Sequence, residues 1–280
     1  MPSIEHLRAF AKLTRTLRVV GVRSDGYHLL EAEMATVDLA DELEIEADAD
    51  GLEVVDEVAW TLGGDARPRG LSAGHDTRDP VFGTVPAGPE NLVVRALAAA
   101  GRRARVRLVK RVPAGGGLGG GSSDAAAVLR WAGLVAPGIA ASLGADVPFC
   151  VLGGRALVSG IGEVVEPLGF EAFTAVLVTP ALTVSTPEVY RAWDALGGPA
   201  GDQENDLEPA ALVVEPRLAW WRDLISEVAG ERPHLAGSGG TWYLERDRDE
   251  ATKLLVELRG AVRAERNNAL VVVADSTAHP

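Results

Sequence analysis

The sequence predicts a soluble globular fold in which strands and helices are mixed without strict alternation. Its 280 residues suffice for one large domain or two modest ones with their own hydrophobic cores. Hydrophobic residues make up 47% and charged residues 24% of the chain, which excludes a disordered chain, a fibre or a coiled coil. The order of the expected elements differs from the regular strand–helix alternation of a doubly wound sheet.

The first half of the chain begins with a predicted hairpin. Residues 9–20 and 33–47 read as extended segments, and Ser24-Asp25-Gly26 between them contains an Asp-Gly pair typical of a hairpin turn. Residues 63–79 are rich in Gly, Arg, Asp and Pro, which predicts an exposed loop. Apolar spacing and alternation then predict the following elements: a helix over 90–100, a strand over 105–112, a helix from about residue 122 and a short helix over 139–143.

The second half continues with strands and helices that form no tandem repeat. Strands are expected over 155–159, 163–167, 175–178, 241–245, 261–264 and 270–273. Helices are expected after Thr186-Pro187, after Asn205-Asp206, and over 216–228 and 248–258. Residues 197–202, which are mostly Gly and Pro, are predicted to be flexible, and a domain boundary is expected near residues 155–170.

The charge balance and the single cysteine exclude several classes of function. Acidic residues outnumber basic ones 40 to 27, and a net charge of -13 disfavours nucleic acids and anionic membranes, which bind basic patches. Cys150 stands alone among apolar neighbours, so it excludes an internal disulfide and a cysteine-built metal centre. A signal peptide and a long apolar run are both absent, so a cytoplasmic protein is expected.

The strongest feature is a glycine-rich loop between a predicted strand and a predicted helix. Six of the nine residues from Pro113 to Gly121 are glycine. Glycines let backbone N–H groups converge on one point, and the helix start adds free N–H donors and a positive dipole end. Ser122 and Ser123 add hydroxyl groups where a phosphate or its metal ion would lie. The pattern predicts a polyphosphate cradle, with a surface loop and serine helix caps as the alternative.

Three familiar motifs do not match this loop. A P-loop needs a lysine before the first serine, and Gly121 stands there. A dinucleotide-binding turn needs an acidic residue about 20 positions further on, whereas residues 131–138 are apolar. A hydrolase elbow needs Gly-x-Ser-x-Gly, which neither Ser122 nor Ser238 satisfies.

Several segments together resemble the GHMP kinase superfamily. Residues 110–125, from Lys110-Arg111-Val112-Pro113 through the glycines to Ser122-Ser123-Asp124-Ala125, are similar to its ATP loop. Further agreeing segments, in the family's order, are Ala11-Lys12, Asp25-Gly26-Tyr27-His28, residues 143–149 and Gly237-Ser238-Gly239, with a weaker match at 205–209. The resemblance spans about residues 9–245 and is closest to the branch that phosphorylates 4-diphosphocytidyl-2-C-methyl-D-erythritol in the non-mevalonate isoprenoid pathway.

The resemblance implies an α+β fold of two domains, residues 1–160 and 161–280, with the active site in the cleft between them. It implies transfer of the ATP γ-phosphoryl group to the 2-hydroxyl of that cytidine diphosphate-linked polyol, with Mg²⁺ on the phosphates. Small molecules would be its ligands, neither nucleic acid nor membrane would bind, and the protein would be a monomer or a homodimer. Two alternatives stay open: another GHMP kinase, for homoserine, mevalonate or a sugar, or a nucleotide-binding regulator without catalysis.

The resemblance also assigns the catalytic pair, Lys12 and Asp146. A carboxylate accepts the proton of the substrate hydroxyl, and a nearby ammonium keeps it ionised and stabilises charge on the transferring oxygens. Without the resemblance, Lys12 could be a surface lysine and Asp146 a turn former. The chain uses only three lysines among 27 basic residues, which makes Lys12 conspicuous.

The remaining site residues are also implied by the resemblance. Those expected to bind ATP are Asn91, Lys110, Pro113, Ala114, Gly115, Gly116, Gly117, Leu118, Gly119, Gly120, Gly121, Ser122 and Ser123, with Asn91 and Lys110 near the adenine and Ser123 also a Mg²⁺ ligand. Those expected to bind the substrate are Thr14, Tyr27, His28, Thr186, Tyr190, Gly237, Ser238 and Gly239. Tyr27 and Tyr190 would stack on the two faces of the cytosine, and His28 would bond its edge. Without the resemblance, Tyr27 and His28 read as a half-buried strand start and Tyr190 as a helix core residue.

One stretch departs from the family pattern. The family usually carries Asn two residues after the catalytic lysine, where this chain has Thr14, which is shorter and has one donor in place of two. Arg15 and Arg18 replace apolar residues more typical of that strand. These changes predict an altered grip on the substrate near the reacting hydroxyl.

Overall fold

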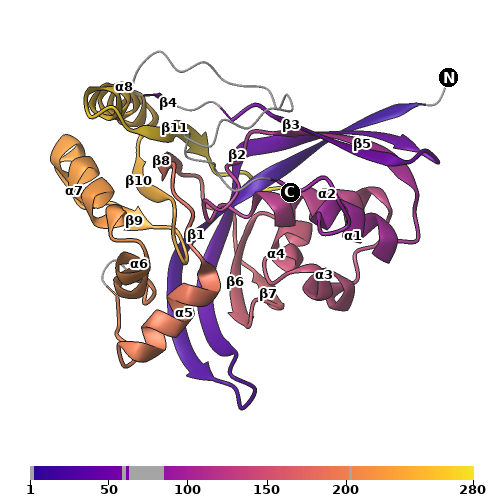
Figure 1. Ribbon diagram of the computed structural model, residues 1–280, viewed down its shortest axis with the longest axis horizontal. Helices are drawn as coiled ribbons and strands as arrows, with labels where there is room; N and C mark the ends of the chain where they lie inside the picture. The colour runs from indigo at the N-terminus through magenta and orange to yellow at the C-terminus, as the bar shows by residue number, and fades with distance from the viewer. Residues whose placement is uncertain (1–2, 59–60, 63–84, 202–203) are drawn as a thin grey trace.

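Two β-sheets with helices against them organise the chain (Figure 1). The computed structural model describes residues 3–58, 61–62, 85–201 and 204–280. The loop predicted for residues 63–79 lies outside the described residues, as does the end of the flexible run predicted over 197–202. The order of strands and helices confirms the predicted α+β class.

The first sheet is built on a long antiparallel hairpin. Strands β1 (Ile4–Val22) and β2 (His28–Ala47) pair along almost their whole length, and Gly26 in the predicted turn has φ +87°. The other strands are β3 (Gly51–Asp56), β5 (Ala104–Lys110), β6 (Arg155–Gly160) and β7 (Val164–Pro167), in the order β3-β5-β2-β6-β7. Because β5 and β6 both pair with β2, that strand joins the two ends of the sheet.

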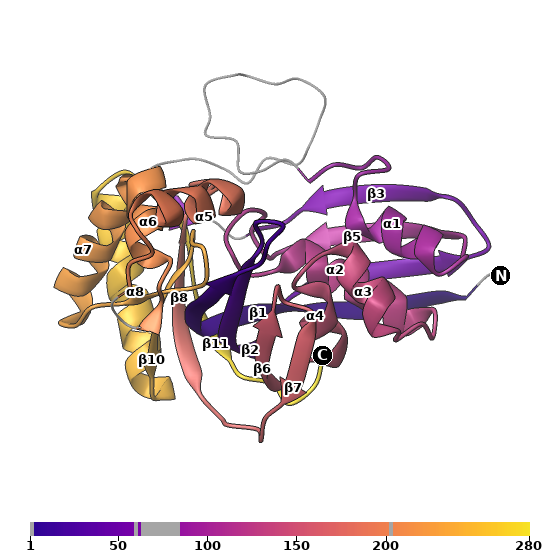
Figure 2. The same cartoon turned by 90° about the horizontal axis from the view of Figure 1, so that it is seen from below.

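Four helices pack beside the first sheet (Figure 2): α1 (Leu92–Ala99), α2 (Gly120–Trp131), α3 (Pro137–Leu143) and α4 (Val147–Leu152). Helix α2 contacts β1 and is almost fully buried from Ser123 to Leu129. Three consecutive alanines, residues 125–127, leave little side-chain volume on this helix, which allows the close approach. The N-terminus of α2 is therefore held firmly against β1.

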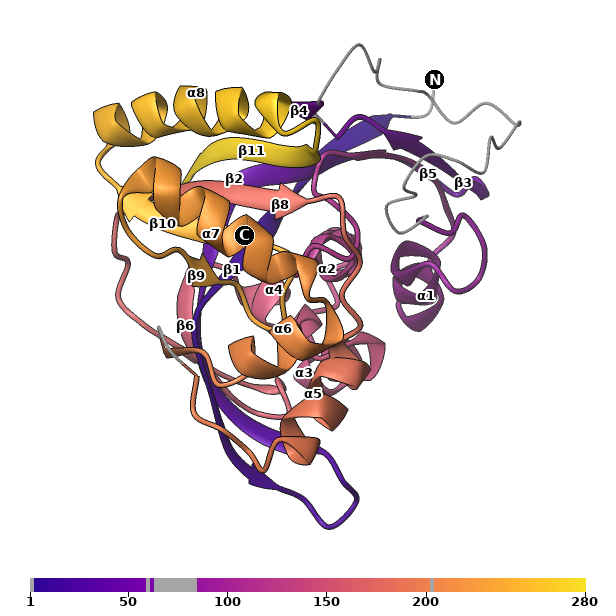
Figure 3. The ribbon, with the colours of Figure 1, turned by 60° about the vertical axis from the view of Figure 1, so that its left-hand side comes forward.

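The second sheet contains β4 (Thr61–Leu62), β8 (Thr174–Pro180), β9 (His234–Leu235), β10 (Trp242–Arg246) and β11 (Asn268–Asp275), in the order β4-β11-β8-β10-β9. Its helices are α5 (Thr186–Ala195), α6 (Glu208–Val214), α7 (Arg217–Ala229) and α8 (Arg248–Ala264). Helix α8 lies along β11 (Figure 3) and also contacts β8 and β10. The central strand β8 is buried over all but its first residue.

The two halves exchange short segments. Strand β4, which belongs to the first half of the sequence, pairs with β11, and near the C-terminus Thr277 N donates to the carbonyl of Thr36. The backbone of Leu17 in β1 forms a parallel bridge to Asn205. The halves are thus hydrogen-bonded to each other at several points, and the division at residue 160 stays a prediction.

Most expected elements are present, with one error and four omissions. The strand predicted over 261–264 is wrong, because those residues continue α8. Leu254, Leu258 and Val262 recur every four positions and are all buried against the second sheet, which favours an uninterrupted helix. The omissions are the short strands β3, β4 and β9 and the helix α4. Helix α4 has six residues, and its apolar run Val147–Leu152 has no helical periodicity to detect.

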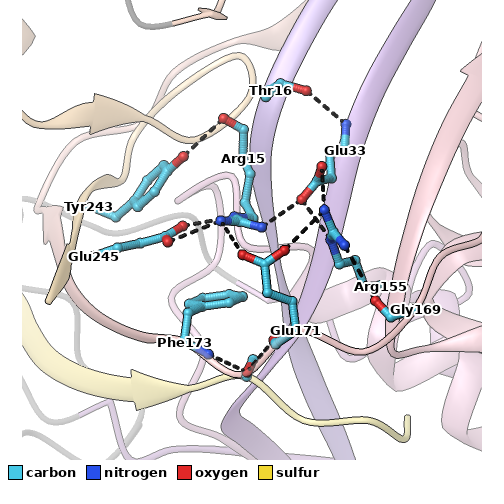
Figure 4. Close-up of polar contacts among 10 residues, drawn as sticks. Arg15, Thr16, Glu33, Arg155, Gly169, Glu171, Phe173, Tyr243 and Glu245 are labelled. Carbon is cyan, nitrogen blue, oxygen red and sulfur yellow. Dashed lines mark hydrogen bonds and ion pairs between the residues drawn. The ribbon is translucent and has the colours of Figure 1, made fainter. Parts of the chain in front are cut away.

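An ion-pair network next to β1 joins the first half of the chain to the second half (Figure 4). Arg15 donates to Glu245 of β10 from Nε at 2.8 Å and from Nη2 at 3.0 Å, and to Glu33 of β2 at 2.6 Å. Arg155 of β6 donates twice to the same Glu33, and Glu171 pairs with both arginines. Burial lowers the pKa of Arg15, but Glu245, Glu171 and Glu33 outweigh it, so the net pKa is raised. Arg15 therefore ties the two sheets together.

We expect Arg15→Met to destabilise the protein by about 1–3 kcal/mol, because three glutamates lose a partly buried counter-charge. Urea unfolding measures the effect. Arg103→Met is the matched control: its ion pair with Asp50 is exposed on both sides, so its loss should leave the urea midpoint at the wild-type value. Equal stability of the two variants would contradict a structural role for the Arg15 network.

Candidate active site

A cavity of about 620 Å³ opens between the two halves. It gathers predicted site residues from both: Lys12, Thr14, Tyr27, His28, Gly117, Gly119, Ser122, Asp146, Thr186, Tyr190, Gly237 and Ser238. Residues without a prediction also line it, among them Met34, Ile161, Arg191 and Asp194. All predicted substrate-binding residues except Gly239 thus line the same cavity as the predicted catalytic pair.

The predicted catalytic pair meets inside this cavity. Lys12 Nζ lies 3.4 Å from Asp146 Oδ2, and the side chains are 7% and 32% exposed. Asp146 directly precedes α4, yet its carboxylate makes no capping bond to the helix. The carboxylate of Asp146 therefore does not act as a turn former, which was the alternative left open by the sequence. The carboxylate faces the cavity with an ammonium beside it.

Thr14 orients the lysine. Lys12 Nζ donates to Thr14 Oγ1 at 3.0 Å, and Thr14 is 1% exposed. A threonine at this position thus holds the ammonium through a single acceptor. The neighbouring Arg15 is directed into the network behind β1, and Arg18 pairs with Asp206, so neither arginine lines the cavity.

The glycine loop fits between three neighbours with no room for side chains. A Cβ built on Gly117, which has φ +80°, would lie 2.7 Å from the carbonyl oxygen of Gly239. One built on Gly119, at φ +69°, would lie 2.7 Å from Cγ of Lys12. The carbonyl of Gly116 accepts a bond from Thr241 at 2.6 Å. The loop therefore contacts both Lys12 and the predicted Gly237-Ser238-Gly239 motif.

A buried ion cluster fastens both ends of this loop. Asp41, which is fully buried, accepts bonds from the backbone N–H groups of Arg111 and Val112, where the loop begins. Lys110 Nζ donates to Asp41 and, at 2.7 Å, to Asp124 of α2, where the loop ends. Sequence analysis missed Asp41, because no local motif marks a strand carboxylate that acts on residues 70 positions away.

Charge in this cluster is unevenly balanced, since one ammonium faces two carboxylates. Burial lowers the pKa of Lys110, but Asp124 and Asp41 raise it above its ordinary value. Burial raises the pKa of Asp124 to about 7, and Lys110 opposes that shift. Asp124 Oδ1 is buried with no hydrogen-bond partner in the described part of the chain.

Several residues predicted to bind ATP have their side chains engaged within the protein. Asn91 caps α1 by accepting from Val93 N, and its amide donates to the carbonyl of Pro86. Lys110 belongs to the buried cluster. Ser123 is 2% exposed, and its hydroxyl donates to the carbonyl of Phe10 at 2.6 Å. The contacts of Asn91, Lys110 and Ser123 with ATP or Mg²⁺ stay predictions, and these hydrogen bonds lend them no support.

The far end of the cavity is aromatic. The ring of His28 stacks on Tyr190 at a centroid distance of 4.7 Å and an interplanar angle of 26°. Tyr27, beside it in the hairpin, is 59% exposed and also lines the cavity. Thr186, at the start of α5, shares a hydrogen bond of 2.7 Å with Ser238. These contacts bring α5 of the second half onto the hairpin of the first.

No group of three or more His, Cys, Asp or Glu side chains is arranged to hold a metal ion in the described ranges. Cys150 is buried as expected, and burial raises its pKa to about 12, which leaves it protonated and unreactive. Among the helices that the structure describes, none is long and apolar enough to cross a membrane.

A glycine loop at a helix start, in contact with a lysine that pairs with an aspartate in one cavity, is the arrangement expected of a small-molecule kinase of the GHMP class. Residues 91–154 match the family model for the GHMP kinases N terminal domain. The 4-diphosphocytidyl-2-C-methyl-D-erythritol kinase of Dinoroseobacter shibae is 36% identical over 83% of this chain and 82% of its own length. That of Paracoccus denitrificans is 34% identical over 87% of each chain. The chain therefore belongs to the 4-diphosphocytidyl-2-C-methyl-D-erythritol kinase family.

Solved structures agree with this assignment. A crystal structure of 4-(cytidine 5'-diphospho)-2C-methyl-D-erythritol kinase superposes with a TM-score of 0.72 at 30% identity, covering 98% of this chain and all of the other. Homoserine kinase from Cytophaga hutchinsonii gives a TM-score of 0.57 at 19% identity over 96% and 95% of the two chains, which shows the shared fold alone.

We expect Lys110→Met to destabilise the protein by about 3–5 kcal/mol, because two buried carboxylates lose their counter-charge. Thermal unfolding measures the effect. Asp124→Asn is the paired variant, which keeps an acceptor for Lys110 and removes the surplus charge. An acid whose folded pKa is raised stabilises the fold at low pH, and that stabilisation is lost as pH rises through about 7. Asp124→Asn should therefore remove a decline in stability between about pH 4 and 7; an unchanged decline would contradict this account of Asp124.

Proposed function

We propose that this kinase transfers the γ-phosphoryl group of ATP to the 2-hydroxyl of 4-diphosphocytidyl-2-C-methyl-D-erythritol. The observation that carries the proposal is the Lys12–Asp146 pair, which lies in one cavity between the glycine loop and an aromatic end. The names of the relatives supply the cytidine substrate. Such an enzyme would act in the cytoplasm on small molecules.

Asp146 would accept the proton of the substrate hydroxyl. As that proton leaves, the hydroxyl oxygen forms a bond to the γ-phosphorus, and the bond between the γ-phosphorus and the β,γ-bridging oxygen breaks, which releases ADP. Lys12, held by Thr14, stabilises the negative charge on the attacking and transferring oxygens. Positioning and electrostatics supply most of the rate in phosphoryl transfer.

The glycine loop would hold the phosphates of ATP. Positive-φ glycines at 115, 117 and 119 turn the backbone without side chains, and α2 begins at Gly120 with free N–H groups. We place Mg²⁺ on the ATP phosphates, since the described residues offer no carboxylate cluster for it. Bound there, it would neutralise phosphate charge.

The aromatic end favours a nucleobase over the substrates of other GHMP kinases. Homoserine, mevalonate and sugars have no flat ring to stack, whereas Tyr27 and Tyr190 both line the cavity with His28. Stacking on an aromatic ring is worth about 1–3 kcal/mol per base. Calorimetric binding of CMP separates the cytidine substrate from these alternatives, and turnover separates an active kinase from a binding protein without catalysis.

We expect Asp146→Asn to lower kcat by about 10²- to 10⁴-fold with a small change in KM, because it removes the proton acceptor but keeps the shape. Lys12→Ala should also lower kcat. ADP release from ATP with the cytidylyl substrate measures both. The control is Asp223→Asn on α7, an exposed aspartate paired only with the adjacent Arg222 among the contacts described, which should retain wild-type activity. Full activity of Asp146→Asn would refute its role as base.

A further inference from the structure

Three side chains of α5 surround the imidazole of His28. Tyr190 stacks on the ring, Trp193 meets it edge-on at a centroid distance of 5.5 Å and an angle of 87°, and Asp194 Oδ1 lies 2.8 Å from Nε2. The positions i, i+3 and i+4 share one face of a helix, so all three reach His28 from the same side. The His28 side chain is 9% exposed and borders the cavity.

Asp194 decides which ring nitrogen of His28 carries the proton. A carboxylate only accepts hydrogen bonds, so Nε2 must be the donor. In the neutral ring, Nδ1 then has a lone pair and no hydrogen. Nδ1 makes no hydrogen bond to any residue that the structure describes, and it is not among the buried polar atoms without a partner. Nδ1 is therefore an acceptor without a partner among the described residues, on a side chain that lines the cavity.

We propose that Asp194 is a specificity-determining positioning residue that makes the base pocket prefer cytosine to uracil. The two pyrimidines differ at one edge, where cytosine carries an amino group and uracil a carbonyl oxygen. An amino group donates to the open Nδ1, whereas a carbonyl oxygen would bring two acceptors together. This inference rests on the proposed function, because it requires that the base of the substrate lies beside His28.

Packing alone does not account for Asp194. Its side chain is 52% exposed, so its ion pair or hydrogen bond contributes little to stability. Tyr190 and Trp193 already fix where the His28 ring lies. The carboxylate of Asp194 also determines which tautomer His28 adopts, and the two aromatic rings cannot determine this. The readout of that choice is the preference between bases.

The experiment is calorimetric titration with CMP and with UMP at pH 8, where an ordinary imidazole is neutral. We expect the wild type to bind CMP at least about tenfold more tightly than UMP, the size of one well-formed hydrogen bond against an acceptor–acceptor contact. In Asp194→Asn the side-chain amide can donate a hydrogen bond to Nε2. His28 can then adopt the other tautomer, with its proton on Nδ1, as happens when an asparagine lies beside the histidine of a serine-protease triad. The preference should then fall to within about threefold.

Three controls separate specificity from structure. Glu188→Gln changes an exposed acid of the same helix and should keep the preference. Asp194→Glu retains a carboxylate and should recover most of it. The KM for ATP should stay unchanged in every variant. A preference for CMP that survives in Asp194→Asn overturns the inference, as does a parallel loss of ATP binding. A wild type that binds neither nucleotide refutes the cytidine substrate of the proposed function, and this inference with it.

Discussion

The pairing of β1 with β2 is the constraint on which the site depends. These two strands carry Lys12 and Thr14 into the cavity, Arg15 into the network behind it, and His28 to the aromatic end. Their register shifts between Phe10 and Lys12 and again between Thr14 and Thr16. Such bulges re-aim side chains and are common beside active sites. The two irregularities flank Lys12 and Thr14, so the hairpin itself determines how Lys12 is presented to Asp146.

An acidic chain that binds two polyanions needs local sources of positive potential. The net charge is -13, and the arginines of the Arg15 network are consumed in ion pairs. The glycine loop supplies backbone N–H groups and a helix start, which attract phosphate without a basic side chain. Lys12 adds a single ammonium beside the reacting group. A negative net charge disfavours extended polyanions, whereas a local cleft of this kind would accept small ones. The ion cluster of Lys110 anchors the glycine loop at both ends.

Short sequence motifs predicted those residues whose role depends on residues next to them in the sequence. The glycine loop was predicted because strand, loop and helix start follow one another directly, whereas the roles of Lys12 and Asp146 were implied by the family resemblance and stay predictions. The residues that sequence analysis missed act over long separations: Asp41 on Lys110 across 69 positions, Asp194 on His28 across 166, and Glu245 on Arg15 across 230. From the sequence, Arg15 was expected to alter the grip on the substrate. Successive residues of a strand point to opposite faces, so the side chain of Arg15 points away from the face that carries Thr14. Only the folded chain brings such pairs together.

The division of the cavity explains how one fold can serve different substrates. The proposed catalytic pair and the glycine loop proposed to hold the phosphates both belong to the first half of the chain. The base end depends on α5 of the second half, where Tyr190, Trp193 and Asp194 act on a single histidine. Replacing the contact face of α5 would change the acceptor substrate while Lys12 and Asp146 stayed in place. Homoserine kinase shares the fold at 19% identity, as expected when function resides in local sites on a common scaffold. In the proposed function, base recognition and phosphoryl transfer are therefore assigned to different elements, which the β1–β2 hairpin connects.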